Sequence, residues 1–199
     1  MTVLVIQPAA LDNWMLSTSP TSQYSTQVTW RCGKQSPSSI YRGLIRFDLS
    51  ALPENAVISS CILQTFVSYD GATVGSTFFL YRSLRAFDGT SCWNNWKTGN
   101  AWTSGGADGA GTDREASPIG SLVNTASMSG LVTWNLTPTT KAALDLGYGW
   151  VSKSNVENSD AYQYRSSEYV TILANRPKLT ITYDVPPTAP SGLTAAECP

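Results

Sequence analysis

The sequence predicts an all-β protein: an antiparallel β-sandwich with one short helix and one long loop rich in tryptophan and glycine. Nine segments rich in Val, Ile, Thr, Tyr, Phe and Trp recur along the 199 residues, and clusters of Gly, Ser, Pro and Asn separate them. Hydrophobic residues make up 42% of the chain, enough for a core, whereas charged residues make up only 14%. Short strands at such spacing favour antiparallel sheets over alternating strand and helix units.

The predicted strands share a β-branched and aromatic composition and end at turn residues. They span residues 2–7, 26–32, 40–49, 57–69, 76–86, 131–136, 147–153, 161–166 and 178–184. Polar and apolar residues alternate most strictly in 178–183. We therefore expect one sandwich domain over residues 1–184 and an extended proline-rich tail over 185–199.

One short helix is predicted after the strand at 131–136. Thr137 is the expected N-cap, Pro138 the first helical residue and Gly147 the terminator. On such a helix Ala143 and Leu146 would face the sheet. The helix is therefore expected to be a lid on the sandwich and not a second domain.

The segment 41–53 alternates polar and apolar residues and stops at a proline turn. Arg46 and Asp48 are expected on one side of this strand, and Ile45 and Phe47 on the other. An arginine in such a run needs a carboxylate or carbonyl partner. The strand is therefore expected to be tied to a fixed place in the sheet.

Three charged residues, Arg46, Asp48 and Glu168, allow two interpretations. A catalytic cluster would need one carboxylic acid with a raised pKa, and nothing in the surrounding sequence indicates it. A structural ion pair that sets strand register needs only the opposite charges. We therefore favour the structural role and predict no catalytic residue.

The longest irregular segment covers residues 92–121 and is expected either to be functional or to pack as an Ω-like cap over the core. Sugar rings stack on exposed aromatic side chains, so aromatic residues in and beyond this loop are candidates for carbohydrate binding. The candidates are Trp93, Trp96, Tyr162 and Tyr164. Core packing is the alternative for all of them, and it is favoured for Trp102 and Trp150.

The same loop contains Asp108, Asp113 and Glu115 among glycine, serine and threonine residues. Calcium binds six to eight hard oxygen ligands, often from irregular loops, so a structural Ca²⁺ is one hypothesis. The spacing does not match an EF-hand. A glycine-rich loop that satisfies its own polar groups is the favoured alternative, and no other cofactor is expected.

The four cysteines lie far apart without C-x-x-C spacing, which argues against a zinc or iron–sulfur site. Cys61 lies in an apolar run and is expected to be a buried small residue. Cys32 and Cys92 flank polar loops and either pair or remain free thiols. Cys198 lies one residue from the end of the tail, so it is the candidate for a disulfide to another chain.

Composition excludes several functions. The chain contains no histidine, which rules out Ser-His-Asp and Cys-His catalysis. The formal net charge of −1 disfavours binding to nucleic acid or to an anionic membrane surface. No apolar run approaches the roughly 20 residues of a membrane span. The first eight residues lack a basic leader and a cleavage site, so no signal peptide is expected.

Several motifs in order resemble the DNRLRE-type β-sandwich modules, which are related to family 96 carbohydrate-binding modules. The match spans about residues 41–183. Its clearest part is the run R-G-L-I-R-F-D-L-S-A-L-P at 42–53, which is similar to the family's R-x-L-[LI]-R-F-D-L-x-x-L-P. The other similar segments are 58–63, 93–95 with 102–108, 132–137, 166–168, 176–179 and 182–183. Ala107 stands as an insertion before the aspartate of the family's W-x-x-G-G-D loop.

The resemblance implies a non-catalytic jelly roll of the kind found in secreted polysaccharide-degrading enzymes, cell-surface proteins and phage structural proteins. The segment 186–195 is also similar to the entry into a fibronectin type III domain. We therefore expect a structural or adhesion module of an extracellular assembly, most concretely a phage virion component of the capsid surface, collar or fibre. A carbohydrate-binding module of a secreted or surface protein is the alternative.

The expected partners follow from that function. They are other virion or surface protein chains, as homo-oligomers or tethered copies, with polysaccharide as a further candidate and neither nucleic acid nor membrane. The expected location is the virion or the extracellular space.

Overall fold

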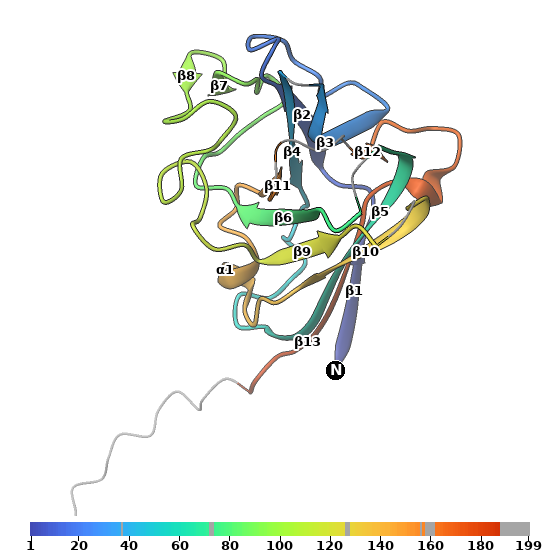
Figure 1. The fold of residues 1–199 in the computed structure, drawn as a ribbon. Helices are drawn as coiled ribbons and strands as arrows, with labels where there is room; N and C mark the ends of the chain where they lie inside the picture. The colour runs from blue at the N-terminus through green and yellow to red at the C-terminus, as the bar shows by residue number, and fades with distance from the viewer. Residues whose placement is uncertain (37, 72–73, 126–127, 156, 158–161, 188–199) are drawn as a thin grey trace, which may run out of the picture.

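The computed structural model describes the whole chain except residues 37, 72–73, 126–127, 156, 158–161 and 188–199. The regular secondary structure of the described part is almost entirely antiparallel strands, joined by turns and loops (Figure 1). The strands are β1 (Thr2–Ile6), β2 (Leu11–Leu16), β3 (Thr29–Ser36), β4 (Ser39–Arg46), β5 (Val57–Asp70), β6 (Thr77–Arg82), β7 (Asn95–Lys97), β8 (Asn100–Ala101), β9 (Gly120–Val123), β10 (Gly130–Leu136), β11 (Trp150–Ser154), β12 (Tyr162–Arg165) and β13 (Lys178–Asp184). One helical turn, α1 (Lys141–Leu144), and a 3₁₀ turn, η1 (Leu173–Asn175), complete the set. No helix among the described residues is long and apolar enough to cross a membrane.

The main sheet closes on itself as an eight-stranded barrel. The order of the strands is β5–β10–β9–β6–β11–β4–β3–β12, and β12 pairs back with β5. The closure depends on the 14-residue length of β5. Its first half pairs with β13, whereas Val67, Tyr69 and Asp70 pair with β12. The predicted antiparallel all-β class is confirmed, but the sheet closes as a barrel where two separate facing sheets were expected.

Large aromatic side chains fill the barrel interior. Trp30, Trp134 and Tyr164 are completely buried, and the rings of Trp30 and Tyr164 stack with centroids 4.3 Å apart. Gly43 makes room for this stack, because a Cβ there would lie 2.5 Å from Cε3 of Trp30. The barrel is therefore a packed core and not an open tube.

Residues 83–119, which we call the cap, cover the outer face of β4 and β11 (Figure 1, green segment at the left). Leu44 of β4 and Val151 of β11 are fully buried in a second apolar cluster with Trp102 of the cap. Ile45, on the opposite face of β4, is equally buried in the barrel core. β4 is therefore buried on both faces at Leu44 and Ile45, and the long loop packs as a cap, which is the Ω-like alternative.

The helix is shorter than predicted and begins later. Thr140, not Thr137, is the N-cap, and its hydroxyl accepts the N–H of Ala143 at 3.1 Å. Leu144 supplies the buried contact, whereas Leu146 is exposed. The turn ends at Asp145, because this side chain binds the next backbone N–H groups and holds the chain out of the helix.

Candidate functional site

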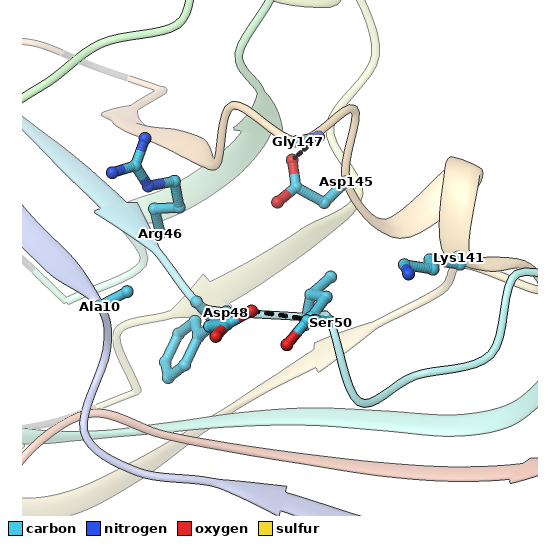
Figure 2. Close-up of a pocket in the computed structure, with 9 residues that line it drawn as sticks. Ala10, Arg46, Asp48, Ser50, Lys141, Asp145 and Gly147 are labelled. Atoms are coloured by element: carbon cyan, nitrogen blue, oxygen red, sulfur yellow. Dashed lines mark hydrogen bonds between the residues drawn. The ribbon is translucent and has the colours of Figure 1, made fainter.

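A pocket of about 470 Å³ opens where β4 ends, and its lining combines opposite charges (Figure 2). Arg46, Phe47 and Asp48 continue the β4 strand into the pocket. Lys141 and Asp145 enter from α1 and the turn after it. The remaining lining residues are Ala10, Leu49, Ser50 and Gly147. Its volume lies in the range of about 300–1,000 Å³ usual for sites that hold small molecules.

The two carboxylates of the pocket are held by backbone N–H groups. Oδ1 of Asp48 accepts the N–H of Ser50 at 2.9 Å, and this bond lowers the pKa of Asp48. Oδ1 of Asp145 accepts the N–H groups of Gly147, Tyr148 and Gly149 at 3.0, 3.1 and 2.9 Å. Burial raises the pKa of Asp145, and these three donors oppose that effect. All three bonds to Asp145 use Oδ1, which leaves its second oxygen without a hydrogen bond within the described structure, whereas the Ser50 side chain also bonds to the Asp48 carboxylate.

The two cations of the pocket are anchored differently. A guanidinium nitrogen of Arg46 donates to the carbonyl of Phe87 at 3.3 Å, and the group lies 6.0 Å from the Phe87 ring centroid. Nζ of Lys141 binds Oε1 of Glu54 at 2.6 Å and the carbonyl of Leu52 at 2.9 Å. The pocket thus offers fixed acceptors beside a guanidinium donor, an arrangement that suits a ligand with several hydroxyl groups.

The predicted trio of Arg46, Asp48 and Glu168 does not assemble. Arg46 and Asp48 line one pocket, but Glu168 lies beside Asp12 and Ser167. Arg46 has the carbonyl partner that its strand position requires, and no ion pair within 4.0 Å forms between it and another described residue. The expected structural ion pair at Arg46 is therefore wrong.

The strand arginine that does pair with carboxylates is Arg42. Its Nε and Nη2 bind the two oxygens of Glu157 at 2.7 and 2.9 Å, and Nη2 lies 3.3 Å from Oδ2 of Asp108. Nη1 donates to the carbonyls of Gly105 and Gly106 at 3.3 and 3.0 Å. Burial lowers the pKa of Arg42, but the carboxylate of Glu157 outweighs burial and raises it. Arg42 therefore fastens the cap to β4.

Asp12 is a buried carboxyl group that the sequence did not single out. Burial, together with the nearby Glu168, raises its pKa to about 7, although one of its oxygens accepts the N–H of Ser167 at 2.7 Å. The hydrogen bond between Asp12 and Ser167 joins β2 to the turn after β12. A polar residue in a short apolar strand gives no local signal of such a partner.

The proposed aromatic platform is not a single surface. Tyr162 and Tyr164 are completely buried inside the barrel, which corrects their assignment to carbohydrate binding. Trp93 and Trp96 are partly exposed but pack against the second apolar cluster, which contains Leu44, Trp102 and Val151. The guanidinium of Arg42 lies 5.0 Å from the Trp93 ring centroid. Trp102, like Trp150, is buried as predicted.

The three loop carboxylates proposed for calcium are used for other contacts. Asp108 pairs with Arg42, Arg114 and Lys153. Asp113 is buried and accepts the N–H groups of Thr103, Ser104 and Gly109. Glu115 binds Arg82 at 3.0 Å. No group of three acidic, cysteine or histidine residues that would suit a metal forms in the described part of the chain, so these residues do not fit a calcium site.

The thiols of Cys32, Cys61 and Cys92 are free and buried. Burial raises the pKa of Cys32 and of Cys61 to about 12, which keeps both thiols protonated and unreactive. Cys32 and Cys92 are therefore not joined. Cys198, the candidate for a disulfide to another chain, lies outside the described residues.

Neither a family model nor a curated protein matches this chain.

Proposed function

We propose that the chain is a non-catalytic structural and adhesion module of an extracellular assembly, most concretely a phage virion. The observation that carries the proposal is one broad face of the molecule, the outer face of β1, β13, β5 and β10, which we call the open wall. The cap does not cover it, and its exposed residues are largely hydroxyl-bearing or apolar. They include Val3, Val5, Ser60, Leu131, Thr133 and Asn135, and Thr180 and Thr182 of β13 are half-buried on the same face.

An uncharged sheet face of this kind suits contact with other protein subunits. Val3, Val5 and Leu131 are 61%, 55% and 52% exposed. Charge on β13 is confined to its ends, at Lys178 and Asp184. Surfaces that bury against a partner are typically depleted in charge at their centre. The opposite side of the barrel is closed by the cap, so assembly would use the open wall.

The proposal includes the family resemblance. We regard the closed barrel as a form of the jelly roll expected for DNRLRE-type modules, with β13 and β1 extending one edge. The sequence motif at 42–53 then has a structural meaning: Arg42 anchors the cap, and the following residues place Arg46 and Asp48 at the pocket.

The test is the composition of particles. Phage particles purified from the culture that produces the chain should contain it in a fixed ratio to the major capsid protein, measured by quantitative mass spectrometry. Antibody labelling in electron micrographs should place it on the particle surface. A chain found only in the particle-free supernatant would contradict the proposal.

Carbohydrate binding is the second candidate, and the pocket of Figure 2 is the observation that favours it. The exposed carboxylate of Asp48 and the second oxygen of Asp145 can accept hydroxyl protons while Arg46 donates. Tyr148, the residue after Gly147, is 38% exposed and offers an aromatic ring for stacking.

Affinity gel electrophoresis in a panel of neutral and acidic polysaccharides tests this candidate. Asp48→Ala should abolish a polysaccharide-dependent mobility shift, because it removes an acceptor from the pocket. The variant should still fold, because the Asp48 side chain is exposed and makes no core contact. Trp96→Ala should leave the shift intact if the pocket is the site, and remove it if the cap tryptophans are. Asp184→Ala, an exposed carboxylate on β13, is the matched control. No retardation of the parent protein in any polysaccharide would exclude this candidate.

A further inference from the structure

The strand β1 is an open edge of the sheet. Among the described residues it pairs only with β13, from Thr2 opposite Tyr183 to Ile6 opposite Leu179. Figure 1 shows β1 along the lower right of the molecule, beside β13. The second edge strand, β2, differs, because four of its six residues are buried. The edge of β1 therefore leaves backbone N–H and C=O groups available to another strand.

This edge lacks the features that usually prevent pairing between molecules. Soluble proteins protect exposed edges with lysine, proline or a β-bulge. The sequence of β1 is Thr-Val-Leu-Val-Ile, without charge or proline, and its register with β13 is uninterrupted. Val3 and Val5 project from the outer face at 61% and 55% exposure. Leu4 and Ile6 are only partly buried against the core. The edge is apolar on both faces.

We propose that β1 pairs antiparallel with β1 of a second copy of this chain, around a twofold axis at Leu4. In this register Val3 lies opposite Val5 of the second copy, Leu4 opposite Leu4, and Thr2 opposite Ile6. The strand is self-complementary, because each pair joins two β-branched or apolar residues and no like charges meet. The two sheets become continuous through four strands, β13–β1–β1–β13.

The other segment that could cover this edge is the chain that follows β13. Its sequence contains Pro186, Pro187 and Pro190, which lack the N–H groups that a ladder requires. A second β1 strand has every N–H that the edge needs. Ile172 and Leu173 form an exposed apolar corner at η1. The corner lies beside the C-terminal end of β1, because the side chain of Gln7 donates to the carbonyl of Leu173 at 3.3 Å. The corner enlarges the contact.

The inference rests on the proposed role in an assembly and specifies one of its contacts. Its test is sedimentation velocity over a range of concentrations, with Cys198→Ser as the background so that no tail disulfide contributes. We expect a dimer that dissociates on dilution. Val5→Lys should weaken dimerisation at least about tenfold, since it places two charges in the buried seam. Val123→Lys, at a valine of similar exposure on β9, should leave the dissociation constant unchanged.

Cysteine cross-linking tests the register. In the same background, Val3→Cys and Val5→Cys should each cross-link poorly alone and cross-link efficiently when the two proteins are mixed and oxidised, because residues 3 and 5 of different copies face each other. A parent protein that is monomeric at all concentrations would overturn the inference, as would a dimer that Val5→Lys does not weaken. Self-cross-linking of either variant without enhancement on mixing would overturn the register. A monomer that still copurifies with particles would refute the inference and leave the proposed function standing.

Discussion

The two sides of this barrel use similar antiparallel strands and differ in what covers them. On the capped wall, formed by β4 and β11, both faces are buried: Ile45 and Trp150 face the core, and Leu44 and Val151 face the cap. On the open wall only one face is buried, and Leu131 on β10 is exposed while Trp134 is completely buried. The capped wall is therefore the side that stabilises the fold, and the open wall is the side on which apolar residues remain exposed.

The charges follow the same division. The cap is fastened by Arg42, Glu157 and Asp108, and by the buried carboxylate of Asp113. The open wall has no comparable network among its described residues: its charges lie at the ends of β13, at Lys178 and Asp184, and its other polar groups are hydroxyls and amides. Charged, hydrogen-bonded contacts hold one side in a single arrangement, and the other side presents a neutral surface.

The largest expected effect comes from a tryptophan of the cap. Trp102→Ala should lower the free energy of unfolding by about 3–5 kcal/mol, because the indole is 5% exposed and its Nε1 donates to the carbonyl of Cys92 at 3.0 Å. Leu131→Ala on the open wall should change it by less than about 0.5 kcal/mol. Urea denaturation followed by circular dichroism measures both. If Trp102→Ala lowered the free energy of unfolding as little as Leu131→Ala does, the cap would not be part of the cooperatively folded structure.

A somewhat smaller effect is expected at Arg42. Arg42→Met keeps the aliphatic contact but leaves Glu157 and the carbonyls of Gly105 and Gly106 without their donor, so unfolding should become easier by about 3 kcal/mol. The cap should also become sensitive to proteases before the barrel does. Limited proteolysis with mass spectrometry locates the first cuts. Lys178→Met on the open wall is the matched control, and early cuts outside residues 83–119 would contradict the assignment of Arg42 to the cap.

Most of the strands were predictable because their sequences carry a local pattern. The last strand, β13, alternates along its length and the long strand β5 along most of it, and the predicted ranges 57–69 and 178–184 match them within a residue. The strand β2 was missed because Asp12 and Asn13 are buried polar residues, which break the expected alternation. The helix was displaced because Thr137 and Thr140 are both plausible caps, and only the fold decides between them.

The pocket was half predictable. Arg46 and Asp48 stand out within one strand motif, but Lys141 and Asp145 lie about a hundred residues further on and have no local signal that links them to that strand. Tyr162 and Tyr164 illustrate the same limit. A strand with tyrosine at alternate positions has the same pattern whether those rings face solvent or core, and here barrel closure through β12 turns them inward.

The smallest expected difference between the two walls is a pH-dependent contribution of Asp108 to the free energy of unfolding. Partial burial would raise the pKa of Asp108, but Lys153 and Arg42 outweigh burial and lower it to about 2. Because the pKa in the folded state lies below that of the unfolded chain, Asp108 stabilises the protein above about pH 4, and this contribution is lost as the pH falls toward 2. The side chain is 37% exposed, so screening limits the contribution to about 1 kcal/mol.

Asp108→Asn isolates that contribution. The difference in free energy of unfolding between parent and variant should be about 1 kcal/mol at pH 7 and should vanish near pH 2, measured by urea denaturation at a series of pH values. Asp184→Asn removes one negative charge from the open wall, where the carboxylate is half exposed, and should cost less than about 0.5 kcal/mol. A difference for Asp108→Asn that stays constant down to pH 2 would show that the carboxylate holds the cap through its shape and hydrogen bonds. The cap would then depend on Arg42 and Trp102 without help from this charge.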